Sequence, residues 1–176
     1  MSKTKVITSK VRFSYLQVFE AKAMSEGQTP KFSVSLIIDK SDKKLIAQIE
    51  AAIKAATEEG KAKLGGTIPK NLKTPLRDGD TDRDEEAYAN SMFVNANTVR
   101  RPGLVDADVN PIISRDELKS GDYGRASINF YAYNTGTSKG IACGLNNLQK
   151  LEDGESLGGG GVSAEADFGG PVDDLL

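Results

Sequence analysis

The stretch Arg125-Ala-Ser-Ile-Asn-Phe-Tyr-Ala-Tyr-Asn134 alternates between apolar and polar side chains. Successive side chains of a β-strand point to opposite faces, so this stretch predicts a strand with two unlike faces. The apolar face carries Ile128, Phe130 and Ala132, and the other face carries Ser127, Asn129, Tyr131 and Tyr133. We therefore expect one face to join the core and the other to present two aromatic rings among polar groups.

A second stretch, residues 91–98, follows the same pattern. Met92, Val94 and Ala96 alternate with Phe93, Asn95 and Asn97. The alternation predicts that the first three side chains point inward. Phe93 is then a further aromatic ring on a polar face.

The N-terminal part of the chain predicts a β-hairpin. Residues 3–21 are rich in β-branched and aromatic side chains and predict one long, bent strand with Val11, Phe13 and Tyr15 on one side. After a polar turn at residues 25–30, alternating apolar residues between Phe32 and Ile38 predict the second strand. Further strand signals lie at residues 103–113, where they flank a turn, and at residues 124–134 and 141–151.

Residues 42–59 change to a helical period. Apolar residues recur there at steps of three and four, Ser41 stands at the N-cap position, and Gly60 stands at the C-cap position. Residues 61–90, rich in glycine, proline and charge, predict a long excursion with little regular structure. About five or six strands and one helix indicate a mainly β, antiparallel fold without a repeated βαβ unit.

Composition narrows the classes of function. The chain has no His and a single Cys143, so an internal disulfide framework and a Ser-His or Cys-His nucleophile are excluded, and we expect no metal and no cofactor. No apolar run of 18 residues and no signal-like N-terminus is present. We expect a cytoplasmic protein, in the host cytoplasm if the protein is viral, that has no membrane partner and is not an enzyme.

Charge is divided unevenly along the chain. Residues 152–176 contain seven acidic groups and no basic group, which leaves 23 basic against 18 acidic groups in residues 1–151. A basic body with an acidic tail predicts binding of nucleic acid together with a separate attachment for proteins.

Aromatic rings beside basic groups predict the DNA-binding residues. Bases stack on such rings while Lys and Arg neutralise phosphates. The predicted stacking residues are Tyr131, Tyr133, Phe93 and Tyr15. The predicted phosphate-binding residues are Arg12, Lys31, Arg77, Arg100, Arg101, Arg125 and Lys139. The alternative interpretation is that these rings form cross-strand pairs or cover a long loop, as in a protein-interaction module that never contacts nucleic acid.

Aspartates in residues 77–86 leave a second alternative open. They resemble a calcium loop, but Arg83 stands where glycine is required and Ala89 where a bidentate Glu should be. A magnesium-dependent nuclease or recombination enzyme would use the carboxylates of Asp78, Asp80, Asp82 and Asp84. A solvated loop is the simpler interpretation.

The C-terminal residues predict a flexible, disordered tail that binds partners. Gly158–Gly161 reads as a linker, because no Lys-Ser/Thr pair follows it as in a phosphate loop. Apolar side chains then stand among aspartates at the tip, and the predicted partner-binding residues are Phe168, Asp173, Asp174, Leu175 and Leu176. The alternative is a disordered end that only aids solubility.

Three stretches carry a resemblance to a known family. Residues 125–134, residues 139–150 and residues 153–159 resemble a family of short bacteriophage single-stranded DNA-binding proteins, once listed as of unknown function, and Pro75–Gly79 extends the likeness. The tail is similar to the acidic tips of bacterial single-stranded DNA-binding proteins. Those tips finish on an aromatic residue, whereas this chain ends on Leu175-Leu176 and has its only tail aromatic at Phe168.

The resemblance implies an OB-fold, here a five- to six-stranded antiparallel Greek-key barrel in residues 1–153, followed by a linker and acidic tail in residues 154–176. It implies sequence-tolerant binding and protection of single-stranded DNA during phage replication, recombination or repair, by a monomer or homodimer. Replication or recombination proteins are the implied partners of the tail. Without DNA, the acidic tail is expected to lie against the basic body and compete with nucleic acid.

Overall fold

β2 (Val11–Lys22) and β3 (Lys31–Asp39) form the hairpin that their side-chain pattern predicts. The computed structural model describes residues 3–23 and 25–157. Its other strands are β1 (Lys5–Ile7), β4 (Leu76–Asp78), β5 (Ser91–Thr98), β6 (Gly103–Val105), β7 (Tyr123–Asn134) and β8 (Lys139–Glu152). The helical elements in the same residues are α1 (Lys43–Glu59), α2 (Gly79–Asp82) and the 3-10 turns η1 (Glu86–Tyr88) and η2 (Arg115–Glu117).

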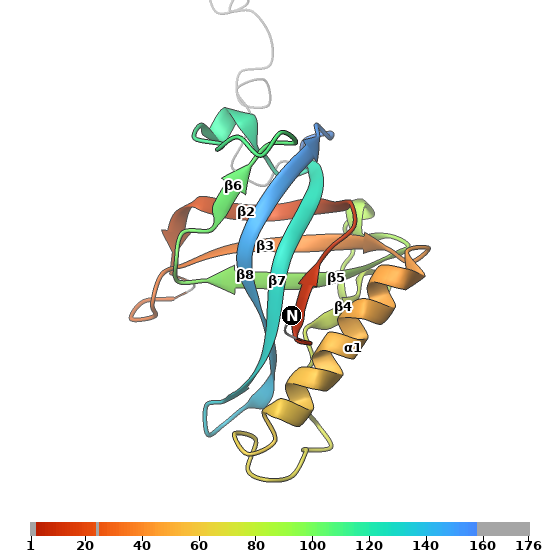
Figure 1. Ribbon diagram of the computed structural model, residues 1–176, viewed down its shortest axis with the longest axis vertical. Helices are drawn as coiled ribbons and strands as arrows, with labels where there is room; N and C mark the ends of the chain where they lie inside the picture. Colours follow the sequence, from red (N-terminus) through yellow and green to blue (C-terminus); the bar gives the residue numbers. More distant parts are fainter. Residues whose placement is uncertain (1–2, 24, 158–176) are drawn as a thin grey trace, which may run out of the picture.

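Strands β2, β3, β5, β8 and β7 close a barrel in that order. Neighbouring strands pair antiparallel except β5 and β8, which pair parallel at Asn97 and Gly144. In Figure 1 the long β7–β8 ribbon runs vertically across the nearly horizontal strands β2, β3 and β5. A five-stranded barrel of this kind is the predicted OB-fold. Antiparallel pairs dominate the barrel, as predicted, and the parallel pair of β5 and β8 closes it.

The barrel interior holds the main core, because each strand turns one apolar face inward. Phe13, Leu36, Ile128 and Phe130 are among its fully buried side chains. The alternation predicted for residues 125–134 is confirmed, since every second residue from Gly124 to Ala132 is buried.

Helix α1 packs its apolar side against β7 and β1. It begins one residue later than expected: the N-cap is Asp42, whose carboxylate accepts a hydrogen bond from the Leu45 amide at 3.2 Å, and not Ser41. Gly60 ends the helix as predicted. A Cβ at Gly60 would lie 2.3 Å from the Ala132 Cβ, so the close approach of helix and barrel also requires this glycine. Neither α1 nor any other helix in the described residues is long and apolar enough to cross a membrane.

Tyr15 departs from the predicted strand pattern. Residues 3–21 form two strands, β1 and β2, and the β2–β3 register shifts between Ser14 and Gln17. At this bulge Tyr15 has a φ of 47° and is 44% exposed, whereas Phe13 is fully buried. A bulge adds a residue to one strand, which reverses the facing of the residues beyond it. Val18 therefore returns to the core, and Tyr15 does not share the side of Val11 and Phe13 as predicted.

The excursion at residues 61–90 is more regular than predicted. β4 extends the sheet beside β5, and α2 and η1 follow it. The ring of Tyr88 in η1 is completely buried, and its hydroxyl donates a hydrogen bond to the Ser35 Oγ at 2.9 Å. This segment therefore covers part of the outer face of β3 and β5. Residues 103–113, expected to form strand structure around a turn, contain β6 and an antiparallel bridge between Val105 and Pro111.

Candidate nucleic-acid interface

A groove of about 520 Å³ lies on the outer face of β2, β3 and β5, in the part that η1 leaves open. In it Ser33 and Ser35 of β3 pair in register with Asn97 and Asn95 of β5. The Ser33 hydroxyl and the Asn95 and Asn97 amides offer both donors and acceptors, whereas the Ser35 hydroxyl is buried and accepts the hydrogen bond from Tyr88. The groove can therefore hydrogen-bond to a polar ligand without demanding one arrangement of its groups.

Two lysines lie side by side at one end of this groove. Lys22 and Lys31 occupy directly opposite positions in the β2–β3 register, are both exposed and both line the groove. Like charges directly opposite on neighbouring strands repel and destabilise a hairpin. A polyanionic ligand would relieve that repulsion. Arg100 and Arg101 lie just beyond the end of β5 at the same end, since Thr98 pairs with Phe32 beside Lys31.

Arg83 stands at the other end of the groove, against the ring of Tyr15. Its guanidinium carbon lies 5.3 Å from the ring centroids of Tyr15 and Tyr88 and 5.2 Å from that of Phe93. Glu85 accepts a hydrogen bond from the Tyr15 hydroxyl at 2.5 Å and pairs with Arg83 at 3.7 Å. Cation–π contacts and these polar contacts fix the Arg83 guanidinium and the Tyr15 ring at the border between the part of the face that η1 covers and the open groove.

Tyr131 is joined to this face through a glycine. Gly144 of β8 pairs with Asn97 on one side and with Asn129 of β7 on the other. A Cβ built on Gly144 would lie 3.4 Å from Cε1 of Tyr131, so the ring lies over this glycine. Tyr131 is 42% exposed. The groove and the Tyr131 ring therefore belong to one continuous surface.

Tyr133 lies in a similar way over Gly140. A Cβ there would approach the Tyr133 hydroxyl to 2.7 Å, and Gly140 is also the bridge partner of Lys73. Tyr133 is half-buried. Neither Tyr131 nor Tyr133 is buried, whereas burial of both rings would favour the alternative of a protein-interaction module.

Phe93 corrects the sequence prediction. It points away from the barrel interior, as the alternation indicates, but it is only 1% exposed. It packs with Ile37 and Tyr88 in a second core cluster, and its ring meets that of Tyr88 edge-on at a centroid distance of 5.1 Å. The excursion covers this end of the face, so Phe93 cannot receive a base.

Other predicted cations have structural contacts. Arg12 donates to the carbonyl oxygens of Gly121 (3.1 Å) and Glu155 (2.8 Å), away from the groove at the far end of β2. The guanidinium of Arg77, on β4, lies 3.8 Å from the carboxylate of Asp82 in α2. Arg125 donates two hydrogen bonds to Gln149.

Two further predicted cations donate side-chain hydrogen bonds to backbone carbonyls. Arg101 donates to the Phe19 carbonyl at 3.0 Å, and Lys139 to the Leu64 carbonyl at 3.1 Å. Arg101 and Arg100 stay near the groove, and Lys139 lies beyond Tyr133 at the tip of the β7–β8 ribbon.

Sequence reasoning missed four residues that line the groove. Lys22 could have been found as the residue opposite Lys31 in the predicted hairpin. Asn95 and Asn97 were placed on the correct face but not selected, and Arg83 was treated only as part of a charged loop.

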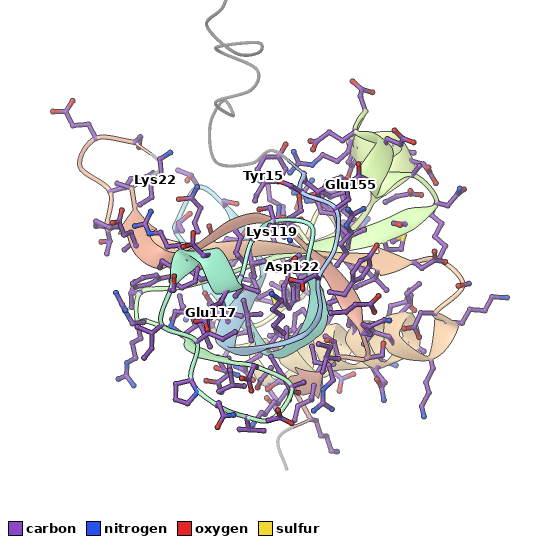
Figure 2. All side chains as sticks on the ribbon, turned by 90° about the horizontal axis from the view of Figure 1, so that it is seen from above. Tyr15, Lys22, Glu117, Lys119, Asp122 and Glu155 are labelled. Atoms are coloured by element: carbon purple, nitrogen blue, oxygen red, sulfur yellow. The ribbon has the colours of Figure 1, made fainter. Side chains whose placement is uncertain are left out.

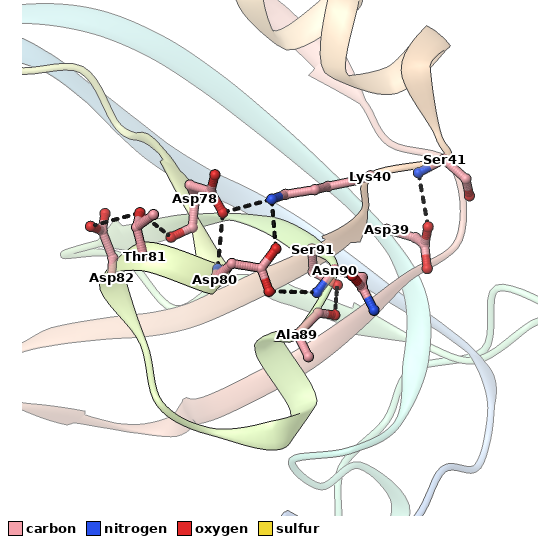
Figure 3. Close-up of polar contacts among 10 residues, drawn as sticks. All are labelled: Asp39, Lys40, Ser41, Asp78, Asp80, Thr81, Asp82, Ala89, Asn90 and Ser91. Carbon is pink, nitrogen blue, oxygen red and sulfur yellow. Dashed lines mark hydrogen bonds and ion pairs between the residues drawn. The ribbon is translucent and has the colours of Figure 1, made fainter.

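The aspartates of the excursion surround a lysine (Figure 3). Lys40 Nζ lies 2.9 Å from Asp78 Oδ1 and 2.6 Å from Asp80 Oδ2. The hydrogen bonds with Lys40 lower the pKa of both carboxyl groups and raise the pKa of Lys40. Asp78 also caps α2, and Asp80 accepts from the Asn90 amide. Within residues 3–23 and 25–157 no group of three acidic or Cys side chains is arranged to hold a metal ion.

The chain leaves the barrel along a buried carboxylate. Asp122 is fully buried and accepts hydrogen bonds from Lys119 Nζ at 2.6 Å and from the Gly154 amide at 3.1 Å. Figure 2 shows Asp122 and Lys119 near the centre of the view down this end of the molecule. Leu157 packs against the cluster of Ile37, Tyr88 and Phe93. Residues 154–157 thus contact the body, and the predicted partner-binding residues 168 and 173–176 lie outside the described residues.

Comparison with known proteins identifies the family. The family described as "Enterobacter phage Enc34, ssDNA-binding protein" matches residues 4–175 of this chain. The chain belongs to this family. Protein p50 of Acyrthosiphon pisum secondary endosymbiont phage 1 is 30% identical over 171 residues, which cover 93% of this chain and 92% of p50. The resemblance predicted from the sequence is confirmed.

Solved structures with a similar fold support the fold of this chain. The single-stranded DNA-binding protein from bacteriophage Enc34 in complex with ssDNA has a TM-score of 0.80 and 21% identity, covering 88% of this chain and 90% of that one. The gp2.5 single-stranded DNA-binding protein of bacteriophage T7 has a TM-score of 0.60 and 14% identity, covering 93% and 99%. This chain therefore shares its OB-type barrel with single-stranded DNA-binding proteins of two phages.

Proposed function

We propose that this protein binds single-stranded DNA along the groove on β2, β3 and β5 and across Gly144 to Tyr131. The opposed pair Lys22 and Lys31 carries the proposal, because its repulsion has no structural benefit and suits a phosphate backbone. Membership of a family described as ssDNA-binding, and a similar structure described as a complex with ssDNA, support it.

In this mechanism the protein captures the strand by stacking and charge. A base stacks on the exposed ring of Tyr131, which contributes about 1–3 kcal/mol per base and tolerates any base because every base has a flat face. Lys22, Lys31, Arg100 and Arg101 neutralise phosphates at one end of the groove. The side chains of Ser33, Asn95 and Asn97 in the groove, which can both donate and accept, favour binding without sequence preference.

We place this activity in phage DNA replication, recombination or repair, in the cytoplasm of the host. The body would protect single strands, and the acidic tail from residue 158 would recruit replication or recombination proteins. Phe168 is the proposed aromatic anchor, with Asp173, Asp174, Leu175 and Leu176 at the tip. Either a monomer or a homodimer is compatible with this arrangement.

Titration of a labelled oligothymidylate of about 20 nucleotides, followed by fluorescence anisotropy, tests the proposal. We expect binding that weakens with salt, with a log-log slope of about −0.7 per neutralised phosphate. The double substitution Lys22→Ala and Lys31→Ala should reduce both affinity and slope. Substituting Lys43 and Lys44, exposed at the start of α1, is the charge-matched control. Absence of binding at low salt, or equal affinity for duplex DNA, would overturn the proposal.

A further inference from the structure

A cluster of lysines surrounds the tip of the β7–β8 ribbon. The loop at residues 60–75 contains four lysines and no acidic residue, and all four are exposed. Together with Lys139 of β8 they form what we call the lysine lobe, which consists of Lys61, Lys63, Lys70, Lys73 and Lys139. Figure 1 shows the loop that follows α1 beside the hairpin tip, at the end of the molecule opposite β6.

Specific contacts hold the loop against the ribbon. Asn134 donates its side-chain amide to the Lys63 carbonyl at 3.0 Å, and Lys139 donates to the Leu64 carbonyl at 3.1 Å. The Ile141 amide donates to the Lys73 carbonyl at 2.8 Å. Leu64 is 1% exposed and anchors the loop in the main core. The position of the lobe relative to β7 and β8 is therefore fixed by packing and hydrogen bonds.

The charges of the lobe are not neutralised within the described part of the chain. Lys10, Lys40, Lys119 and Lys150 each pair with a carboxylate there, whereas none of the lobe lysines does. Five cations gathered without acidic partners repel one another and raise the local positive potential. Such a patch attracts a polyanion and does not stabilise the fold.

The lobe continues the proposed DNA path. Tyr133 lies over Gly140, and Lys73 is the bridge partner of Gly140 on the opposite side. Tyr131 lies closer to the groove, with its ring over Gly144, whose partner on β5 is Asn97. Two tyrosine rings, each beside a glycine of β8, therefore lie between the groove and the lobe.

We propose that the lysine lobe is a second phosphate-binding segment, which holds the part of a DNA strand that extends beyond the groove and Tyr131. The inference rests on the proposed function and adds the direction in which the DNA strand leaves the groove and the length of strand that is bound. A short strand is held by the groove alone. A longer strand also crosses Tyr133 and reaches Lys63, Lys70 and Lys73.

Binding of oligothymidylates of two lengths tests this inference. OB-folds occupy about 4–16 nucleotides. An oligomer of about 6 nucleotides should therefore contact the groove alone, whereas one of about 20 nucleotides should contact both the groove and the lobe. The lobe variant carries K63Q, K70Q and K73Q. The control carries K43Q, K44Q and K54Q, which remove the same charge from exposed positions of α1. Thermal melting first confirms that both variants fold like the wild type.

We expect the lobe variant to bind the long oligomer roughly 10- to 100-fold more weakly at low salt, with a salt slope shallower by about 2, because three phosphate contacts are lost. Its affinity for the short oligomer should change less than about twofold. The α1 variant should match the wild type with both. The inference would be overturned if both variants lost affinity alike, if the lobe variant lost affinity equally for both oligomer lengths, or if its salt slope were unchanged. If the wild type itself binds neither oligomer, the proposed function fails, whereas wild-type binding with an unaffected lobe variant rejects the lobe alone.

Discussion

The ring of Tyr131 lies over Gly144 of the neighbouring strand, with 3.4 Å between its Cε1 and the position a Cβ would take at that glycine. The absence of a side chain at Gly144 lets the ring rest on the sheet while 42% of Tyr131 stays exposed. The face of the ring that points away from the sheet is thereby available to a base. This contact also joins β7 to the groove through Asn97, the partner of Gly144 on β5.

Substituting Tyr131 by Ala should weaken binding of oligothymidylate by about 1–3 kcal/mol, or roughly 5- to 150-fold, because one stacking surface is lost. Tyr131→Phe should bind within about twofold of the wild type, since the ring remains. Gly144→Val should weaken binding by displacing the ring, whereas Gly144→Ala should have little effect at a 3.4 Å approach. Fluorescence titration of each purified variant measures these affinities. Full affinity in Tyr131→Ala would remove this residue from the interface.

Phe93 should affect stability and not DNA contact. Truncation to Ala leaves a cavity beside Ile37 and Tyr88 and should cost about 3–5 kcal/mol of the free energy of unfolding. The milder Phe93→Leu should lower the melting temperature yet leave DNA affinity unchanged, because the buried ring has no face for a base. Thermal melts and titrations of the same preparation separate the two effects. A Phe93→Leu variant of normal stability and weak binding would restore the sequence prediction.

Asp122 should make stability depend on pH. Burial by itself raises the pKa of Asp122, but hydrogen bonds from Lys119 Nζ and from the Gly154 and Lys119 amides, with the charge of Lys150, outweigh it and hold the pKa below its usual value. A lowered folded-state pKa contributes stability that is complete above the unfolded-state value of about 3.9 and is lost as pH falls through the folded-state value.

Asp122→Asn should therefore cost about 1–3 kcal/mol at neutral pH, because hydrogen bonds to a charged group are lost. The difference in melting temperature between this variant and the wild type should shrink as pH falls below about 4. Melting curves from pH 3 to 7 provide the measurement. A difference that stays constant over this range would show that the charge of Asp122 is not responsible.

The acidic tail should compete with DNA only through its charge. Arg12 and Leu157 hold residues 155–157 on the body, so a deletion that tests the tail should begin at residue 158. We expect removal of residues 158–176 to tighten binding roughly 3- to 10-fold at low salt and to have no effect at about 1 M salt, where charges are screened. A tail with Asp167, Asp173 and Asp174 changed to Asn should behave similarly at full length.

Deleting residues 155–176 should in addition lower the melting temperature, because the contacts of Arg12 with Glu155 and of Leu157 with its cluster are lost. Unchanged affinity after removal of residues 158–176 would reject the competition and leave the groove proposal in place.

Local patterns predicted the main strands, the helix and a mainly β fold, whereas the barrel was predicted from the family resemblance. The alternation from Gly124 to Ala132 has a period of two that only a half-buried strand satisfies, and the spacing of apolar residues in α1 identifies its buried side. The position of Gly60 was predicted correctly because a helix end needs few neighbours. Ser41 was misassigned because Asp42, one residue later, accepts the capping hydrogen bond.

Distant contacts decided the candidate site. Alternation states that Phe93 and Asn97 share a face, but only the fold shows that Tyr88 covers the first and leaves the second open. The bulge that turns Tyr15 outward is likewise set by pairing with β3.

By itself, the sequence determined the two faces of the regular strands β3, β5 and β7, the helix and the separation of a basic body from an acidic tail, because these depend on the order of neighbouring residues. Only the tertiary structure decided which polar face stays open, that Gly144 carries the ring of Tyr131, and that the loop at residues 60–75 gathers its lysines at the ribbon tip. The physical reason is that exposure is a property of what packs on a face, and the covering residues lie far away in the chain.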